Sequence, residues 1–373
     1  GMVSGSSVGN TVTTGSVTIP MMKRTGYPPE FAGAVEAASS TGGQIMPPIM
    51  GAAAFIMAEM TGYDYSDIIV RAILPAFLYF LGIFLGVHFK AKKLGLVGLK
   101  REELPKWKLL LPKIYLLLPL IVLTWMVIAG QTMAKSAIYG TIVAIAVGII
   151  NKDDRMTPSK FVNGLENGGK NCLSIGIACG IAGIISVCIT MTGLGGKLIT
   201  YVVKLSNGHL FIALFLTMIC CIILGMGVPT TANYIIMAST CAPILINGMG
   251  MHILAANMFV FYFGIVADIT PPVALAAYAG SAIAKGNPMK TGINATKLAI
   301  AAFIVPYIFA YNNAMIFVGD VTFLGVTSIV ISATLGMASI ASGFMGYLIH
   351  DLKWYSRIAL IAGGLLMVIP GTV

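Results

Sequence analysis

The stretch "GIVADITPPVALAAYAG", residues 264–280, contains two consecutive prolines, Pro271 and Pro272, and a carboxylate, Asp268, within an apolar region that covers about 253–284. Proline lacks a backbone N–H and clashes with the preceding turn, so a proline pair breaks a helix. A charged side chain inside a bilayer is costly and commonly marks a functional site. The stretch therefore predicts a broken membrane helix that lines a binding site.

The composition is that of a membrane protein. Of the 373 residues, 57% are hydrophobic and 10% are charged, whereas soluble domains usually have about 25% charged residues. Runs long enough to span a bilayer recur along the chain. They are 68–89, 109–129, 134–150, 172–190, 295–312, 323–346 and 356–372. We predict an all-α, polytopic protein in the lipid bilayer.

The net charge of +10 does not indicate a nucleic-acid partner, because the basic residues gather in a few loops, chiefly 90–108 and 152–170. The positive-inside rule places these loops in the cytoplasm. The six cysteines lie in apolar spans without the paired spacing of a zinc site, so no transition-metal site is expected. No organic cofactor is indicated either.

A second proline pair, Pro47 and Pro48 in "SSTGGQIMPPIMGAAAF" (39–55), lies 224 residues before Pro271 and Pro272. Upstream, 4–20 can be laid over 225–243 with an offset of 223, so that Asn10 corresponds to Asn233. We infer an internal duplication. The loop charges predict halves of opposite orientation, each with a re-entrant hairpin and a proline-broken helix.

Interrupted helices in corresponding parts of two halves indicate the binding site of a secondary transporter. Their free carbonyls can bind a cation, and their free N–H groups suit an anion. The expected ion-binding residues are Ser4, Gly5, Ser7, Asn10, Thr41, Gly42, Gly43, Gly225, Gly227, Thr230, Thr231, Asn233, Ala267, Asp268 and Thr270. The expected substrate-binding residues are Ser6, Gln44, Pro47, Pro48, Pro271, Pro272 and Val273.

Acidic residues make the expected site asymmetric. The 224-residue offset matches Asp268 with Gln44, so the first half has no equivalent carboxylate. Asp268 either stays ionised and neutralises a bound sodium ion, or is protonated and carries the coupling proton itself. Capping of a broken helix end is the structural alternative. For Glu36 and Glu59 we expect solvated positions, in the cytoplasm and at the outer interface.

The duplication suggests four regions. Residues 1–89 form the first repeat, 90–171 the connecting scaffold spans, 172–312 the second repeat, and 313–373 a transmembrane tail. In the second repeat an apolar arm, about 206–224, precedes the hairpin tip. Its counterpart would precede Gly1. We therefore expect an N-terminally truncated first hairpin, with Gly1 at membrane depth.

The motif regions, "SGSSVGNTVTTGSVTIPMMKRTGYPPEFAGAVEAASSTGGQIMPPIMGAAAFIMAE" and "GMGVPTTANYIIMASTCAPILINGMGMHILAANMFVFYFGIVADITPPVALAAYAG", resemble the large membrane subunit of tripartite ATP-independent periplasmic (TRAP) transporters, in its fused, TAXI-associated form. The resemblance covers about 1–312. It implies an elevator-type symporter of the prokaryotic inner membrane, driven by Na⁺ or H⁺, that imports small organic acids. It also implies a TAXI-type solute-binding protein, and a small permease subunit or its fused equivalent, as partners.

Other functional classes remain open on the residues alone. An ion channel can also use broken helices and rings of carbonyls, and a secondary carrier can work without a binding protein. A membrane enzyme would need a catalytic cluster, and the sequence has no HExxH, GxSxG or phosphate-loop motif. We therefore expect a transporter and not an enzyme.

Overall fold

The structure is a computed structural model that describes residues 5–98, 111–151, 155–319 and 321–368. Within these ranges it is almost entirely helical, and the only β-type pairing is an isolated bridge between Tyr347 and Asp351. Five helices there are long and apolar enough to cross a membrane. The predicted all-helical, polytopic fold is confirmed.

The helices of the first repeat are α1 (Ser7–Arg24), α2 (Pro29–Gly42), α3 (Ala52–Thr61) and α4 (Tyr65–Lys93). Those of the second are α10 (Leu210–Gly225), α11 (Thr230–Thr240), α12 (Ala242–Met249), α13 (Ile253–Val266), η3 (Ala267–Ile269), α14 (Leu275–Ala284), α15 (Pro288–Leu298) and α16 (Ile300–Tyr311). Between α4 and α10 lie η2 (Leu111–Leu117), α6 (Leu118–Ile128), α7 (Met133–Ile150), α8 (Pro158–Met191) and α9 (Leu194–Ser206). The chain continues with η4 (Asn313–Ile316), α17 (Phe323–Met345) and α18 (Trp354–Val368).

Helix boundaries repeat at the offset expected from the proline pairs. Helices α2 and α13 begin at Pro29 and Ile253 and end at Gly42 and Val266, each pair 224 residues apart. Both proline pairs follow these ends, and both contain a cis peptide bond. The duplication inferred from sequence is therefore also present in the backbone.

Several expected spans differ from the observed helices. The run 172–190 is part of α8, which begins earlier, at Pro158. The run 295–312 is divided between α15 and α16, which meet at Ala299. The described part of the run 109–129 begins at Leu111 with the 3-10 helix η2. Hydropathy locates apolar segments but does not show where one helix stops and the next begins.

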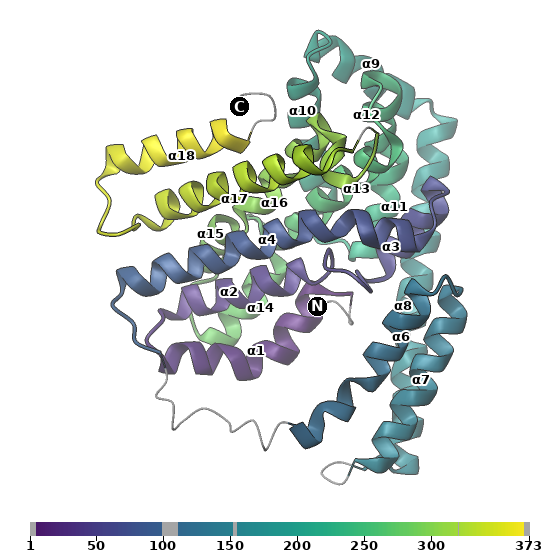
Figure 1. Cartoon of the computed structure of the whole chain (residues 1–373). Coiled ribbons are helices and arrows are strands. Elements are labelled where there is room, and N and C mark those ends of the chain that lie inside the picture. The colour runs from purple at the N-terminus through teal and green to yellow at the C-terminus, as the bar shows by residue number, and fades with distance from the viewer. Residues whose placement is uncertain (1–4, 99–110, 152–154, 320, 369–373) are drawn as a thin grey trace.

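The two repeats interlock around the proline segments (Figure 1). Helix α14 of the second repeat packs on α1 and α2, while α3 of the first packs on α11 and α13. Glycines allow the closest contact: a Cβ at Gly280 would lie 2.6 Å from the carbonyl oxygen of Gly33. Small residues permit such close helix approach in membranes. Each half therefore supplies one helix to the core of the other.

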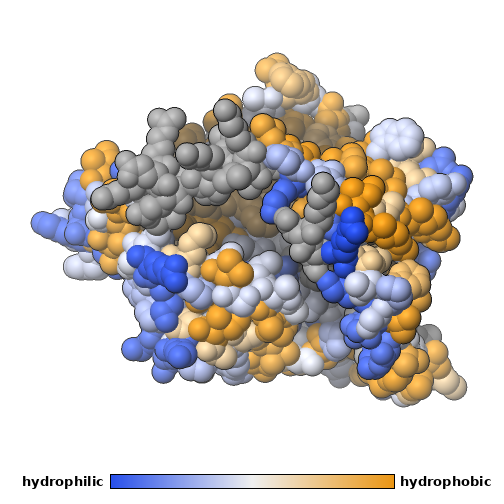
Figure 2. Space-filling view, turned by 90° about the horizontal axis from the view of Figure 1, so that it is seen from below, coloured by the Kyte–Doolittle hydropathy of each residue, from blue (hydrophilic) through white to orange (hydrophobic). Residues whose placement is uncertain are grey.

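Large apolar side chains cover much of the outer surface. Figure 2 shows hydrophobic residues in orange beside blue hydrophilic groups on the face seen from below. Val17 is 71% exposed, and Phe84, Trp125 and Ile184 are comparably exposed. A water-soluble protein rarely exposes such contiguous apolar area. This surface suits contact with lipid or with other membrane helices.

Candidate functional site

A cavity of about 750 Å³ lies where the hairpin tips and the proline segments of both repeats meet. Residues from all four of these stretches line it. Seven of the predicted residues line the cavity: Gly5, Ser6, Ser7, Gly227, Thr230, Thr231 and Asp268. The remaining lining residues are Val8, Gly9, Thr13, Ile49, Gly51, Ala52, Phe55, Val228, Pro229 and Leu275.

The first tip is formed by the start of α1. The Ser6 hydroxyl caps this helix by accepting a hydrogen bond from the backbone N–H of Gly9 at 3.1 Å. Gly5 has a φ of 62°, and a Cβ there would lie 3.2 Å from the Cα of Gly51. Backbone therefore touches backbone between the tip and the segment after Pro48. Ser4, also predicted as a ligand, and Gly1, predicted at membrane depth, lie outside the described residues.

Asp268 lies in the short helix η3, directly after α13. It is 8% exposed and lines the cavity. The Ser7 hydroxyl donates a hydrogen bond to its Oδ2 at 2.5 Å. The carboxylate of the second repeat is thus hydrogen-bonded to the tip of the first. The residue that makes the two repeats differ, Asp268 in place of Gln44, lines the cavity.

The second tip also has a glycine with positive φ and a hydrogen-bonded asparagine at the equivalent position, but its helix lacks a side-chain cap. Gly227 has a φ of 77°, and Thr230 and Thr231 form the first turn of α11. The Asn233 side chain donates to the carbonyl of Gly264 at 3.0 Å. In the first repeat, the equivalent Asn10 donates to the hydroxyl of Ser40 at 2.7 Å. One asparagine therefore ties each tip to the broken helix of its own repeat.

Past each proline pair the backbone turns through the left-handed region, at Met50 (φ 55°) and at Ala274 (φ 35°), which are 224 residues apart. Helix α3 then begins at Ala52 and α14 at Leu275, and both residues line the cavity. Neither helix start has a side-chain cap, and α11 lacks one as well. Three helix N-termini with uncapped N–H groups thus meet at the cavity.

Other predicted site residues do not line the cavity. They are Asn10, Thr41, Gly42, Gly43, Gln44, Gly225, Asn233, Ala267, Thr270, Val273 and the four prolines. Thr270 donates its hydroxyl to the carbonyl of Val266 in its own helix. Thr41 Oγ1, both amide atoms of Gln44 and Asn233 Oδ1 are buried without a hydrogen-bond partner in the described part of the chain. Such oxygens suit a hard cation.

The prediction that Glu36 is solvated is wrong. Glu36 is 7% exposed, and it accepts hydrogen bonds from the hydroxyls of Thr14, Thr18 and Ser40. Burial arises because α1 lies along α2, a tertiary contact that the sequence around Glu36 does not show. The polar pairs Thr14/Thr18 and Glu36/Ser40, each spaced four residues apart, were a usable signal. Glu59 is exposed, as expected.

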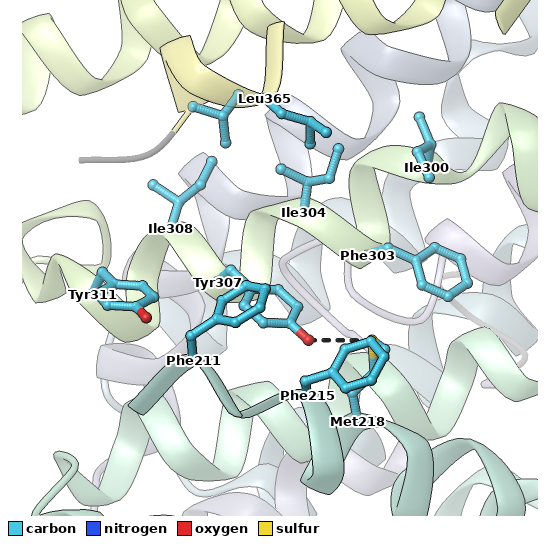
Figure 3. Close-up of a pocket in the computed structure, with 11 residues that line it drawn as sticks. Phe211, Phe215, Met218, Ile300, Phe303, Ile304, Tyr307, Ile308, Tyr311 and Leu365 are labelled. Atoms are coloured by element: carbon cyan, nitrogen blue, oxygen red, sulfur yellow. Dashed lines mark hydrogen bonds between the residues drawn. The ribbon is translucent and has the colours of Figure 1, made fainter. Parts of the chain in front are cut away.

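A second cavity, of about 460 Å³, lies between α10, α16 and α18 and is almost wholly apolar (Figure 3). Its ring and branched side chains include Phe215, Phe303 and Ile304. Two tyrosine hydroxyls are in view, and that of Tyr307 donates to Met218 Sδ at 3.3 Å. This lining has no charged side chain, so the polar cavity is the candidate site.

No group of three or more His, Cys, Asp or Glu side chains that could hold a metal occurs among the described residues. A sequence model of the family described as "Tripartite ATP-independent periplasmic transporter, DctM component" matches residues 1–324. The chain belongs to this family. It is therefore a TRAP transporter component, and its apolar helices are those of a multi-pass membrane permease.

A relative of this DctM-family chain is the C4-dicarboxylate TRAP transporter large permease protein DctM of Pseudomonas aeruginosa. The two are 22% identical over 324 residues, which make up 84% of this chain and 74% of the relative. The family match covers both hairpin tips and both proline segments. It supports the resemblance seen in the motif regions at the level of the large TRAP permease.

Proposed function

We propose that this DctM-family chain is the large permease of a binding-protein-dependent symporter that imports small organic acids, with carboxylates as the solute class. The observation that supports this best is the polar cavity between the repeats, which combines uncapped helix N-termini with one buried carboxylate. These two features suit an anionic solute and a cation in the same site.

In this proposal, backbone N–H groups bind the carboxylate of the solute. The cavity lining includes no Lys or Arg among the described residues. The N-termini of α3, α11 and α14 present free N–H groups and positive dipole ends there, which favours a carboxylate. The named relative from Pseudomonas aeruginosa is described as a C4-dicarboxylate transporter. A dicarboxylate could engage helix ends from both repeats at once.

The coupling ion of the proposal is sodium or a proton. Asp268 lines the cavity together with the hydroxyl-bearing residues Ser6, Ser7, Thr230 and Thr231, which makes this region rich in oxygen atoms. Hard cations prefer such ligands. A cation beside Asp268 would offset the negative charge of the solute and so link the two binding events.

The partners follow from membership of a tripartite system. We propose a TAXI-type solute-binding protein outside the prokaryotic inner membrane, and a small permease subunit or its fused N-terminal equivalent within it. Transport would follow an elevator mechanism, in which the interlocked tips and broken helices move together. Their close backbone contacts, such as Gly5 against Gly51, support movement as one body.

The proposal is tested with the complete permease complex in proteoliposomes, with and without its solute-binding protein. Labelled C4-dicarboxylate is supplied outside, and a sodium gradient or a pH gradient is imposed in turn. We expect binding-protein-dependent, saturable uptake and counterflow that follow one of the two gradients. Unsaturable flux that carries current would identify a channel, and gradient-independent uptake would contradict the proposed coupling.

A further inference from the structure

A buried carboxylate that the proposed site does not use lies on α2. Thr14 donates its hydroxyl to Oε1 of Glu36, and Thr18 donates to Oε2 at 2.5 Å. Ser40, one turn later on α2, also donates to Oε1, at 3.2 Å. Both carboxylate oxygens are therefore enclosed by hydroxyls from two helices.

No cationic side chain neutralises Glu36 in the described part of the chain. Lys23 instead donates to the carbonyl of Ala284, and Lys90 lies over the ring of Phe31. The other titratable side chains on the helices packed against α2 do not bond to Glu36. They are Lys23, Arg24, Tyr65, Asp67, Arg71, Tyr79, His88, Lys90, Lys92, Lys93, Asp268, Tyr278, Lys290 and Lys297. Burying an unpaired ion costs several kcal/mol. A bound positive charge is therefore expected at Glu36 during part of the cycle.

The space around Glu36 favours a proton over a metal ion. A Cβ at Gly15 would lie 3.1 Å from Glu36 Cγ, so the backbone of α1 presses directly on the side chain. Each carboxylate oxygen is already within hydrogen-bond distance of a hydroxyl. A sodium ion would have to push these oxygens apart, whereas a proton needs no added volume.

The hydroxyls can serve both charge states of Glu36. Thr14 and Thr18 also lie within hydrogen-bond distance of the carbonyls of Asn10 and Thr14, at 2.9 and 3.1 Å. With Glu36 ionised, both hydroxyls donate to it. With Glu36 protonated, one hydroxyl donates its hydrogen to the backbone carbonyl instead. Its oxygen then accepts a hydrogen bond from the O–H of the carboxylic acid. Neither state requires the heavy atoms to move.

The second repeat shows that this helix pair does not need the polar cluster in order to pack. At the duplication offsets, Glu36 corresponds to Val260, Thr14 to Met237, Thr18 to Cys241 and Ser40 to Gly264. All four are apolar or small, and Met237 Sδ lies 3.1 Å from the Cβ position of Gly264. The same backbone arrangement is thus filled by apolar contacts, which argues against a purely structural role for Glu36.

The cluster is connected to the cavity. Asn10 donates to Ser40, and Ser40 donates to Glu36. Asn10 lies one turn after Ser6 and Ser7, which line the cavity, and Thr13, the neighbour of Thr14, lines it too. A change of charge at Glu36 would therefore be felt at the first tip through two hydrogen bonds.

We propose that Glu36 is a proton-binding residue of the transport cycle, with Thr14, Thr18 and Ser40 orienting its carboxyl group. The proton comes from water on one side, binds to a carboxylate oxygen, and returns to water on the other side; no other bond is made or broken. This inference rests on the proposed transport function and adds a second acidic group to it, distinct from Asp268.

The direct test is infrared spectroscopy of the purified permease in lipid across a pH series, which needs no solute. We expect a C=O stretching band of a protonated carboxylic acid that disappears as pH rises and is absent from Glu36→Gln. The matched control, Glu59→Gln, removes an exposed carboxylate on α3 and should leave that band unchanged. The difference spectrum of wild type minus Glu36→Gln separates this band from the band of any other acid, including Asp268; the absence of a difference band at every pH would overturn the proposal.

Thr18→Val provides a second variant that keeps the acid. It removes the donor to Oε2, so we expect the same band at a shifted frequency. An unshifted band in a folded Thr18→Val protein, judged by size-exclusion chromatography, would show that the titrating acid lies elsewhere and would also overturn the proposal.

Coupling is tested in proteoliposomes with the binding protein and labelled C4-dicarboxylate. We expect Glu36→Gln to lose accumulation driven by a pH gradient, and Glu36→Asp to recover it in part. Wild-type accumulation by Glu36→Gln under that gradient would refute the coupling role. If the wild-type complex itself takes up no acid, the proposed function fails, while the infrared titration still decides whether Glu36 binds a proton.

Discussion

Replacing Asp268 by Asn removes one charge from the polar cavity and little else. The two side chains have nearly the same size, and the Asn carbonyl can still accept the hydrogen bond that Ser7 donates at 2.5 Å. Asp268 is only 8% exposed, so solvent screens its charge weakly. A change in transport would therefore report on the carboxylate charge rather than on packing.

The expected magnitude follows from Coulomb's law. Two unit charges about 4 Å apart interact with about 4 kcal/mol at an effective dielectric constant of about 20. At about 1.4 kcal/mol per factor of ten, loss of this interaction weakens cation binding by roughly 700-fold. We therefore expect Asp268→Asn to abolish gradient-driven uptake at ordinary ion concentrations while the protein remains folded in the membrane.

The measurement is uptake of labelled C4-dicarboxylate as a function of sodium concentration and of pH, with the binding protein present. Asp351→Asn is the matched control, because Asp351 is exposed and its ion pair with Lys93, at 3.8 Å, lies at the surface. Accumulation by Asp268→Asn equal to wild type, with unchanged ion dependence, would show that the carboxylate only caps the broken helix.

Three further changes test the geometry around the cavity. Ser7→Ala removes the hydroxyl donor to Asp268, and since hydrogen bonds to charged groups contribute about 1.5–3 kcal/mol, we expect the apparent ion affinity in uptake assays to change by roughly 10-fold or more. Gly280→Ala places a Cβ against the Gly33 carbonyl, so we expect about 1–3 kcal/mol of destabilisation, seen as a lower thermal unfolding temperature in detergent. Tyr65→Phe removes the hydroxyl that lies within hydrogen-bond distance of the carbonyls of Pro48 and Ile49, so we expect the free energy of unfolding to fall by about 1–3 kcal/mol. An unchanged unfolding temperature would contradict a structural role for this hydroxyl.

The fold was predictable where the signal was local in sequence. A proline pair interrupts any helix that contains it, so the breaks after Gly42 and Val266 follow from the residues alone. The constant offset then predicts the repeat, because duplicated segments that fold alike must break at corresponding residues. Hydropathy located the ends of the helices less well, because the run 172–190 is part of a helix, α8, that already begins at Pro158.

The cavity wall was only partly predictable. Proximity to a break identifies residues near the site but does not tell which side of the helix faces it. Thr41 and Gln44 are fully buried and do not line the cavity, whereas Gly51 and Leu275, just past the proline pairs, line it. The left-handed backbone at Met50 and Ala274 redirects the chain there, and neither residue type signals that conformation.

The burial of Glu36 lay beyond local reasoning for a different reason. Its neighbours in sequence are small residues, which are compatible with either a solvated or a buried helix face. Besides Ser40 on the same helix, its partners are the threonines of α1, 18 and 22 residues earlier. Long-range pairing of two polar stripes is a tertiary fact, and it is visible in sequence only when both stripes are examined together.

The two repeats therefore have similar backbone arrangements, but each has its acidic residue at a different position. Asp268 lines the cavity, and its equivalent in the first repeat is the uncharged Gln44. Glu36 does not line the cavity, and its equivalent in the second repeat is Val260. A symmetric pair of carboxylates would repel each other across a small cavity and resist an anionic solute. With one carboxylate in the wall and the other enclosed by hydroxyls, the arrangement is compatible with our proposal that a cation and a carboxylate solute occupy the cavity together. The charge of Glu36 can then alter the tip through Asn10 without adding to the repulsion at the solute.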